Sequence, residues 1–147
     1  MIRLVKVNKG NWEECINLPT SEDHVRFVAP NGYSIAKSQF YPDTIKACCI
    51  YADDNMVGFV MYGPREDDPG LLWIDEMMIT EDHRSRGYGR AALQAIFNDA
   101  NQEGYSRVGL STKSENIKAI RLYESAGFKS TGKTYDGGEE FINELPA

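Results

Sequence analysis

Histidine and cysteine are scarce in this sequence. Its 147 residues include two histidines, His24 and His83, and three cysteines, Cys15, Cys48 and Cys49. Two histidines so far apart do not have the spacing of metal ligands, so we predict no metal. An odd number of cysteines with a neighbouring pair does not form a disulfide framework, which predicts a reducing, cytoplasmic setting. Because neither Cys48 nor Cys49 has a histidine near it in the sequence, both are expected to be buried strand residues rather than acyl acceptors.

Long apolar runs are also absent. The first residues, MIRLVKVNKGNW, lack the uninterrupted apolar core of a signal peptide, and no run reaches the length of a membrane span. The net charge of −6 argues against nucleic acid, whose binding needs basic patches, and is compatible with a cationic partner. With no repeat or linker, residues 1–147 are expected to form one domain that binds neither a membrane nor a nucleic acid.

The pattern of apolar residues predicts a mixed α/β fold built on one sheet. Strands are predicted at residues 2–7, 45–53, 56–63, 71–80, 107–112 and, as one or two strands, within 131–145. Helices are predicted at residues 87–103 and 116–126. Residues 11–18 and 24–41 are expected to be helical or mixed, with breaks at Pro30, Gly32 and Pro42, and residues 64–70 are expected to form a solvated loop. Glu66, Asp67 and Asp68 of that loop are also candidates to face a polycation.

The segment HRSRGYGRAAL, residues 83–93, concentrates positive charge where a strand ends and a helix begins. The first N–H groups of a helix have no partner inside it, and the helix dipole favours an anion there. Gly87 and Gly89 allow a ligand to approach the main chain, and Arg84, Arg86 and Arg90 suit phosphate oxygens. The segment therefore predicts a pyrophosphate-binding loop. His83 either lies near the phosphates or is exposed.

A dinucleotide fingerprint is the alternative for this loop. Gly87, Gly89 and Ala92 have its spacing, but the fingerprint also requires an acidic residue at the end of the next strand. That strand, RVGLST, has none. We therefore rank this alternative a distant second.

The pattern Arg84-x-x-Gly87-x-Gly89 between a strand and a helix resembles the acetyl-coenzyme A signature of the GCN5-related N-acetyltransferases (GNAT). Residues 116–128, NIKAIRLYESAGF, resemble the second hallmark of that superfamily, and the likeness is good over residues 57–128. Ser85 departs from it, since many members have another glycine there. The resemblance implies the GNAT fold, a mostly antiparallel central sheet flanked by helices. Within the superfamily, Trp73-Ile74-Asp75 and the ending TGKTYDGGEEF are most similar to bacterial spermine/spermidine (diamine) acetyltransferases.

The resemblance also implies roles for particular residues. The loop Ser85–Arg90 would hold the pyrophosphate of acetyl-CoA through its backbone. The backbone of Met77, Met78 and Ile79 would pair with the pantetheine arm, and one of its N–H groups would stabilise the oxyanion. Asn116 would contact the cofactor arm, and Tyr123 would protonate the leaving thiolate. The expected cofactor-binding residues are Met77, Met78, Ile79, Arg84, Ser85, Arg86, Gly87, Tyr88, Gly89, Arg90, Asn116 and Tyr123.

Two acidic residues, Asp75 and Glu76, interrupt the apolar strand at 71–80, where a carboxylate is costly without a partner or a role. In a regular strand they point to opposite faces. The resemblance implies that Asp75 accepts the proton of the amine through water, and Glu76 is the alternative.

The prediction is an acetyl-CoA-dependent acetyltransferase that acts on a small-molecule amine, favouring a polyamine, by direct attack in a ternary complex. Another amine acceptor and a non-catalytic acyl-CoA-binding module are the alternatives, and a homodimer is left open.

Overall fold

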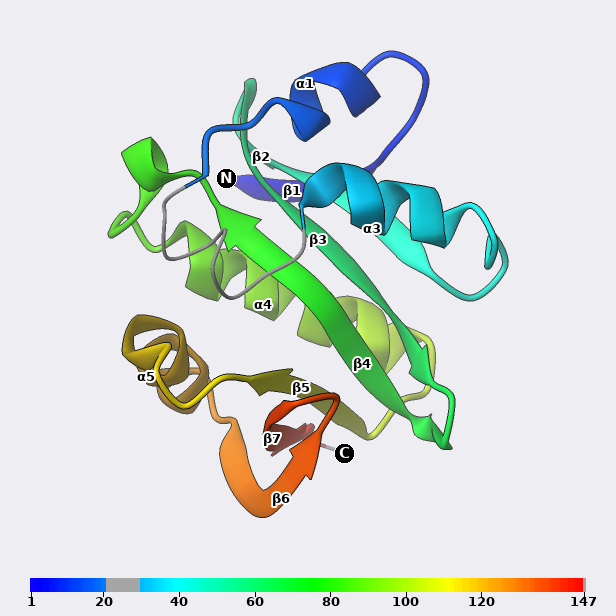
Figure 1. Ribbon diagram of the computed structural model, residues 1–147, viewed down its shortest axis with the longest axis vertical. Coiled ribbons are helices and arrows are strands. Elements are labelled where there is room, and N and C mark those ends of the chain that lie inside the picture. The colour runs from blue at the N-terminus through cyan, green and yellow to red at the C-terminus, as the bar shows by residue number, and fades with distance from the viewer. Residues whose placement is uncertain (21–29, 147) are drawn as a thin grey trace.

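One twisted sheet forms the centre of the molecule (Figure 1). The computed structural model describes residues 1–20 and 30–146, and these contain a sheet of seven strands in the order β1-β2-β3-β4-β5-β7-β6. The strands are β1 (Ile2–Lys6), β2 (Lys46–Ala52), β3 (Asn55–Arg65), β4 (Asp68–Ile79), β5 (Arg107–Thr112), β6 (Lys129–Tyr135) and β7 (Gly138–Glu144). Neighbouring strands are antiparallel except for the parallel pair β4–β5. This confirms the predicted mixed, mostly antiparallel sheet.

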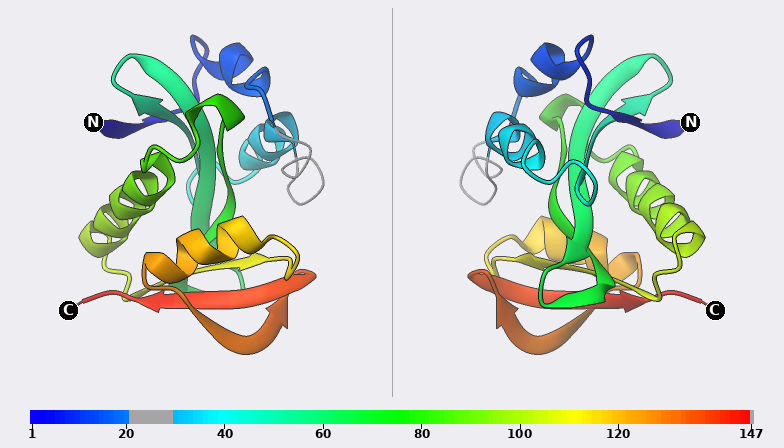
Figure 2. Two further views of the ribbon diagram at one scale, coloured as in Figure 1. Left: turned by 90° about the vertical axis from the view of Figure 1, so that its left-hand side faces the viewer. Right: turned by 90° about the vertical axis from the view of Figure 1, so that its right-hand side faces the viewer.

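Helices cover both faces of the sheet. They are α1 (Trp12–Ile16), α3 (Asn31–Ser38), the 3₁₀ turn η1 (Glu81–His83), α4 (Tyr88–Gln102) and α5 (Ile117–Ser125). Figure 2 shows α4 on one face of strands β2–β4 and α1 and α3 on the other. None of these helices is both long and apolar enough to cross a membrane.

Each face has its own apolar core. Under α4, the helix residues Leu93 and Ile96 pack with Val60 of β3 and Val108 of β5, which confirms the helix predicted at residues 87–103. Under α1 and α3, a second cluster contains Cys15, Cys49, Phe59, Met61 and Met78. The second cluster confirms Cys49 as a buried strand residue, and Cys48 is buried on the α4 face.

Two predictions about chain breaks were wrong. Helix α3 continues through Gly32, because this glycine is only its second residue and Pro30 already occupies the N-cap. Residues 64–70 form no long loop, since β3 extends to Arg65 and β4 begins at Asp68. The rest of the segment predicted as helical or mixed, residues 21–29 with His24, lies outside the described residues.

The carboxylates of residues 64–70 are partly neutralised. Arg65 binds Asp67 at 2.6 Å, and Arg107 of β5 binds Asp68 at 2.9 Å. Of the three carboxylates considered for a polycation, only Glu66 has no ion-pair partner among the described residues.

Candidate acetyltransferase site

Strands β4 and β5 separate along their length. They pair only at Leu71–Arg107, Leu72–Val108 and Trp73–Gly109, although both strands continue further. Beyond Trp73, the only described strand that pairs with β4 is β3. The edge of β4 that faces β5 therefore has no strand partner there (Figure 1). Met77, Met78 and Ile79 lie on this open edge. Unpaired N–H and C=O groups of a strand edge can bind an extended ligand in the manner of an added strand.

The loop before α4 leaves room for an anion. Gly87 is the N-cap of α4 with φ of +80°, and no side chain caps the helix. A Cβ atom placed on Gly87 would have no neighbour within 4 Å, so the space beside the backbone is open. Ser85 also has a positive φ, +63°. The uncapped N–H groups of the first turn and this open space fit a pyrophosphate group.

The three arginines of the loop differ in their contacts. Arg84 Nε donates a hydrogen bond to the carbonyl of Ile79 at 3.3 Å, which ties the loop to the end of β4. Arg90 Nη1 donates to the carbonyl of Ser125 at 2.9 Å, which ties α4 to the end of α5. Arg86 is exposed and has no hydrogen-bond or ion-pair partner among residues 1–20 and 30–146. Arg86 is thus the loop guanidinium most available to a ligand.

The remaining loop residues mainly shape the loop. A Cβ on Gly89 would lie 2.9 Å from Leu122, so this glycine lets α4 and α5 approach each other. Tyr88 packs against the core under α4, and its ring lies 6.3 Å from that of His83. His83 is half-buried, and its Nδ1 atom lies 2.6 Å from Thr80 Oγ1.

Helix α5 carries the two predicted residues of the second hallmark. Asn116 occupies the N-cap position, but its side chain does not cap the helix and instead donates to Thr112 Oγ1 at 3.4 Å. Tyr123 is half-buried, with its ring 5.9 Å from that of Phe128. Its hydroxyl group has no hydrogen bond with a described residue. Removal of water by the surrounding protein raises the pKa of Tyr123 to about 12.

A β-bulge in β4 changes the orientation of the two carboxylates. Ile74 pairs with Tyr62 and Glu76 pairs with Met61, so Asp75 is an extra residue on β4. Before the bulge, even-numbered Ile74 packs in the α4 core; after it, odd-numbered Met77 does so. Asp75 and Glu76 therefore both face the side of α3, and not opposite sides as in a regular strand.

Glu76 is buried, with 4% of its surface exposed. Its Oε1 atom accepts a hydrogen bond from Ser34 of α3, and its Oε2 atom has no partner within the described part of the chain. Burial raises the pKa of Glu76 to about 7; the hydrogen bond from Ser34 lowers it, and the charge of Asp75 raises it further.

Asp75 is exposed, but the protein atoms around it still remove part of its hydration. This desolvation raises its pKa, the charge of Lys37 on α3 lowers it, and the charge of Asp136 raises it. Ser34, Lys37 and Asp136 were missed in the sequence, because nothing in their local patterns indicates that the fold brings them to Asp75 and Glu76.

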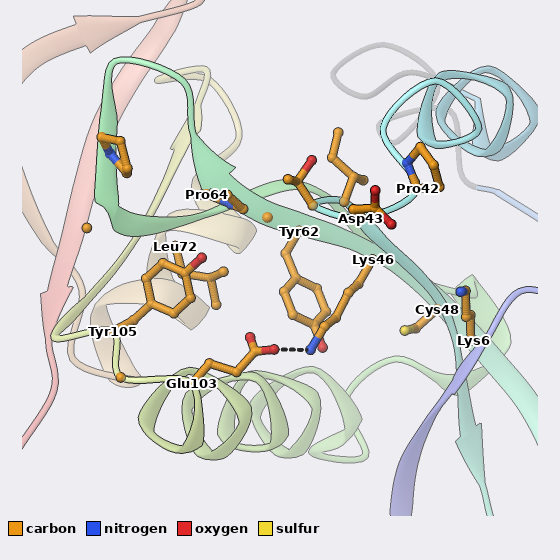
Figure 3. Close-up of a pocket in the computed structure, with 16 residues that line it drawn as sticks. Lys6, Pro42, Asp43, Lys46, Cys48, Tyr62, Pro64, Leu72, Glu103 and Tyr105 are labelled. Atoms are coloured by element: carbon orange, nitrogen blue, oxygen red, sulfur yellow. Dashed lines mark hydrogen bonds and ion pairs between the residues drawn. The ribbon is translucent and has the colours of Figure 1, made fainter.

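A cavity of this structure lies elsewhere (Figure 3). Its volume is about 770 Å³, and its lining includes Lys46, Tyr62, Glu103 and Tyr105. Lys46 binds Asp99 at 2.8 Å and Glu103 at 2.9 Å. Glu103 follows the last residue of α4, so the cavity lies at the end of this helix opposite Gly87. It contains none of the predicted site residues.

Comparisons with known proteins identify the family and the fold. The model of the Acetyltransferase (GNAT) family matches residues 12–128, so the chain belongs to this family. The spermine/spermidine N(1)-acetyltransferase of Bacillus subtilis (strain 168) is 29% identical over 153 residues, which cover 98% of this chain and 99% of that protein.

Solved structures show the same fold. The spermidine N-acetyltransferase from Vibrio cholerae in complex with CoA and spermine has a TM-score of 0.77 at 15% identity, over 98% of this chain and 95% of that one. AAC(6')-Ib in complex with paromomycin and acetyl-CoA has a TM-score of 0.76 at 16% identity, over 97% and 93%. Because these complexes contain different amines, the shared fold does not identify the acceptor. The chain is thus an N-acetyltransferase of the GNAT type, related to spermine/spermidine acetyltransferases.

Proposed function

We propose that the protein transfers the acetyl group of acetyl-CoA to a primary amine of a polyamine, such as spermidine or spermine, by direct attack in a ternary complex. The main observation that supports this proposal is the open edge of β4, which runs from the carboxylates Asp75 and Glu76 toward the uncapped N-terminus of α4. This edge connects a place suited to a cationic amine with a place suited to a pyrophosphate. The relationship to spermine/spermidine acetyltransferases supports the choice of acceptor.

Residues on both sides of the splayed strands would hold acetyl-CoA, which supplies the acetyl thioester when bound. The first-turn N–H groups of α4 and the side chain of Arg86 bind the pyrophosphate. The backbone of Met77–Ile79 binds the extended pantetheine arm from one side, and Asn116 contacts it from α5. One N–H group of the β4 edge stabilises the negative charge that develops on the carbonyl oxygen.

The two neighbouring carboxylates have different roles toward the amine. Asp75, exposed and negatively charged, attracts the ammonium group of the acceptor. Glu76 has a pKa of about 7, which suits a group that accepts a proton near neutral pH. The ammonium thus loses a proton to Glu76 through water and attacks as the neutral amine. Tyr123 keeps its hydroxyl proton at neutral pH, because its pKa is about 12, and supplies that proton to the sulfur as the C–S bond breaks. The nitrogen loses its second proton as the amide forms, and this proton restores the tyrosine hydroxyl.

An acceptor panel tests the proposed function. The kcat/KM values are measured from thiol release at saturating acetyl-CoA for spermidine, spermine, a neutral-tailed monoamine of similar length, an aminoglycoside and a lysine peptide. We expect the polyamines to give the highest values. A higher value for the monoamine, the aminoglycoside or the peptide would overturn the polyamine assignment, and no thiol release with any amine would overturn the catalytic one.

The role of Tyr123 is tested with Tyr123→Phe, which keeps the ring and its packing on Phe128. Turnover should fall about a hundredfold, as on loss of a general acid, while the affinity for acetyl-CoA is unchanged. Tyr105→Phe is the matched control, because Tyr105 lines the distant cavity, and it should retain full turnover. Equal activity of the two variants would remove Tyr123 from the chemistry.

A further inference from the structure

Arg65, at the end of β3, sits in a cage formed by three other strands. Its guanidinium carbon lies 4.7 Å from the ring centre of Trp73 on β4 and 4.2 Å from that of Tyr135 on β6. Arg65 Nη1 donates to Glu140 on β7 at 2.5 Å. The two aromatic rings also contact each other, with centres 4.7 Å apart. Arg65 therefore joins the C-terminal hairpin β6–β7 to β4 by cation–π contacts and a buried ion pair.

Two neighbouring residues, Gly109 and Thr131, help to position the side chains of the cage. A Cβ on Gly109, the β5 partner of Trp73, would lie 2.9 Å from the indole ring, so the glycine makes room for Trp73. Thr131 Oγ1 donates to Glu140 Oε1 at 2.8 Å, which fixes the carboxylate that Arg65 binds. The side chain of Arg65 is only 12% exposed. Such a desolvated arginine is a structural anchor and not a flexible surface side chain.

The cage controls the position of the β6–β7 turn. Tyr135 is followed directly by Asp136 and Gly137, which form the turn with φ of +51° and +82°. Trp73 precedes Asp75 by two residues on β4 and so points to the same face. The contact between Trp73 and Tyr135 thus brings the β6–β7 turn toward Asp75, and the charge of Asp136 contributes to the raised pKa of Asp75.

A second observation concerns the buried polar atoms next to Asp75. Two buried acceptor atoms, Glu76 Oε2 and Asn31 Oδ1, have no donor in the described ranges of the chain. Asn31 and Ser34 lie one turn apart on α3, and Ser34 binds Glu76, so both acceptors lie on the face that Asp75 shares. Buried acceptors without donors are costly, and a water molecule between Glu76 and the bound ammonium group would satisfy Glu76 Oε2.

We propose that Asp136 is a specificity-determining residue for the second ammonium group of a polyamine, and that Arg65 is the positioning residue that holds Asp136 beside Asp75. This inference rests on the proposed function. The first ammonium group binds at Asp75 and Glu76, and Asp136 binds a cationic centre further along the chain of the acceptor. Lys37, which also acts on Asp75, places a positive charge on the α3 side and directs the second centre toward Asp136.

The test compares Arg65→Lys with the matched control Arg107→Lys. Lysine keeps the charge but loses the planar guanidinium that stacks on two rings. Arg107 also binds a carboxylate, Asp68 at 2.9 Å, but it is not part of the cage. We expect Arg65→Lys and Asp136→Asn each to raise KM for spermidine about fivefold, the effect of one partly exposed ion pair. The kcat, the affinity for acetyl-CoA and the KM for the neutral-tailed monoamine should not change, and Arg107→Lys should behave as the unaltered protein.

A double variant distinguishes positioning from general support. Because Arg65 acts through Asp136, Arg65→Lys combined with Asp136→Asn should raise KM no more than Asp136→Asn alone. Calorimetric titration of spermidine in the presence of CoA should show the same fivefold loss without turnover. Additive effects, or equal losses for spermidine and the monoamine, would overturn the proposal. If Arg65→Lys does not fold, Tyr135→Leu opens the cage from the other side and is judged by the same outcomes.

The two proposals fail in different ways. If the unaltered protein neither binds nor acetylates a polyamine, the proposed function fails, and this inference fails with it. If it acetylates spermidine with a KM that Asp136→Asn does not change, only this inference fails.

Discussion

Glu76 carries its carboxyl group in surroundings that oppose its charge. Only 4% of the residue is exposed, Ser34 supplies one hydrogen bond, and Asp75 adds a like charge nearby. A buried acid with a pKa near 7 is mostly protonated below that value in the folded protein, whereas in the unfolded chain it ionises near its ordinary value. Keeping such a group therefore reduces stability at neutral pH, which is typical of residues kept for their chemistry.

The variant Glu76→Gln should remove this pH dependence. Between about pH 4.5 and pH 7 the unfolded chain loses the proton and the folded protein keeps it, so the stability of the native protein falls as pH rises through this window. The cost above pH 7 is on the order of 3 kcal/mol for a pKa raised from 4.5 to about 7. Urea unfolding at several pH values should show that Glu76→Gln becomes more stable than the native protein above pH 7. Equal pH slopes for the two proteins would contradict the assignment.

Glu140 is a control for Glu76, because its pKa is shifted in the opposite direction. Burial alone would raise the pKa of Glu140, but hydrogen bonds from Arg65 and Thr131 outweigh it and hold the pKa below its ordinary value. Its ionised form therefore stabilises the fold at neutral pH, and this contribution is lost as the pH falls through its folded pKa. Glu140→Gln should accordingly be less stable than the native protein near pH 7.

At the scale of single residues, the sequence indicated that Asp75 and Glu76 were unusual but not how they are arranged. A carboxylate inside an apolar strand is visible in the sequence. The bulge that turns both side chains toward α3 is not, because it depends on the register of β4 against β3. For the same reason, Ser34, Asn31 and Asp136 could not be assigned to the site, since each comes from an element far away in the chain.

Helix α4 has a similar glycine at each end. Gly87, at the N-cap, has φ of +80°, and Gly104, beyond the C-terminus, has φ of +89°. A Cβ on either would have no neighbour within 4 Å. The two glycines thus have similar positive φ angles and similar free space beside them. They differ in the end of the helix that they occupy.

Valine at these two positions should separate folding from cofactor binding. Gly87→Val and Gly104→Val should each lose about 1–3 kcal/mol of stability, because a β-branched residue is strained at positive φ. Only Gly87→Val should also weaken acetyl-CoA binding, since its side chain fills the space beside the uncapped N–H groups. Calorimetric titration of both variants with acetyl-CoA measures the difference. Equal affinities would remove the loop before α4 from the cofactor site.

Elements were predicted well where their signals are local. Strand β5 was predicted at residues 107–112, where it lies, and α4 was predicted at 87–103 and extends over Tyr88–Gln102. Both predictions rest on apolar periodicity and on the glycines of the loop. Residues 64–70 were predicted as a loop because Pro64, Pro69 and Gly70 dominate the local pattern. In the structure β3 and β4 continue into this segment, where Arg65 and Arg107 bind its carboxylates. The pair of Arg107 with Asp68 involves β5, a distant part of the chain, and was not visible in the sequence.

Across the whole molecule, the negative charge is only partly available to a ligand. Residues 64–82 contain seven carboxylates and one arginine, within a chain of net charge −6. Asp67 and Asp68 are neutralised by arginines, and Glu76 is buried. Asp75, Glu81 and Asp82 have no ion-pair partner in residues 1–20 and 30–146, and Asp136 adds a further exposed charge from the β6–β7 turn. The sheet therefore presents a negative region before the basic loop that begins at Arg84.

This field should make the preference for polyamines sensitive to salt. The screening length falls from about 30 Å at 0.01 M ionic strength to about 8 Å at 0.15 M, so carboxylates away from the reacting amine lose their influence on an approaching polycation. We expect kcat/KM for spermidine to fall more steeply with ionic strength than kcat/KM for the neutral-tailed monoamine, because the polyamine carries more charge into the same field. Both acceptors are measured at saturating acetyl-CoA, so that salt effects on cofactor binding do not enter. Parallel decreases for the two acceptors would mean that the carboxylates do not select for charge, and that the preference has another origin.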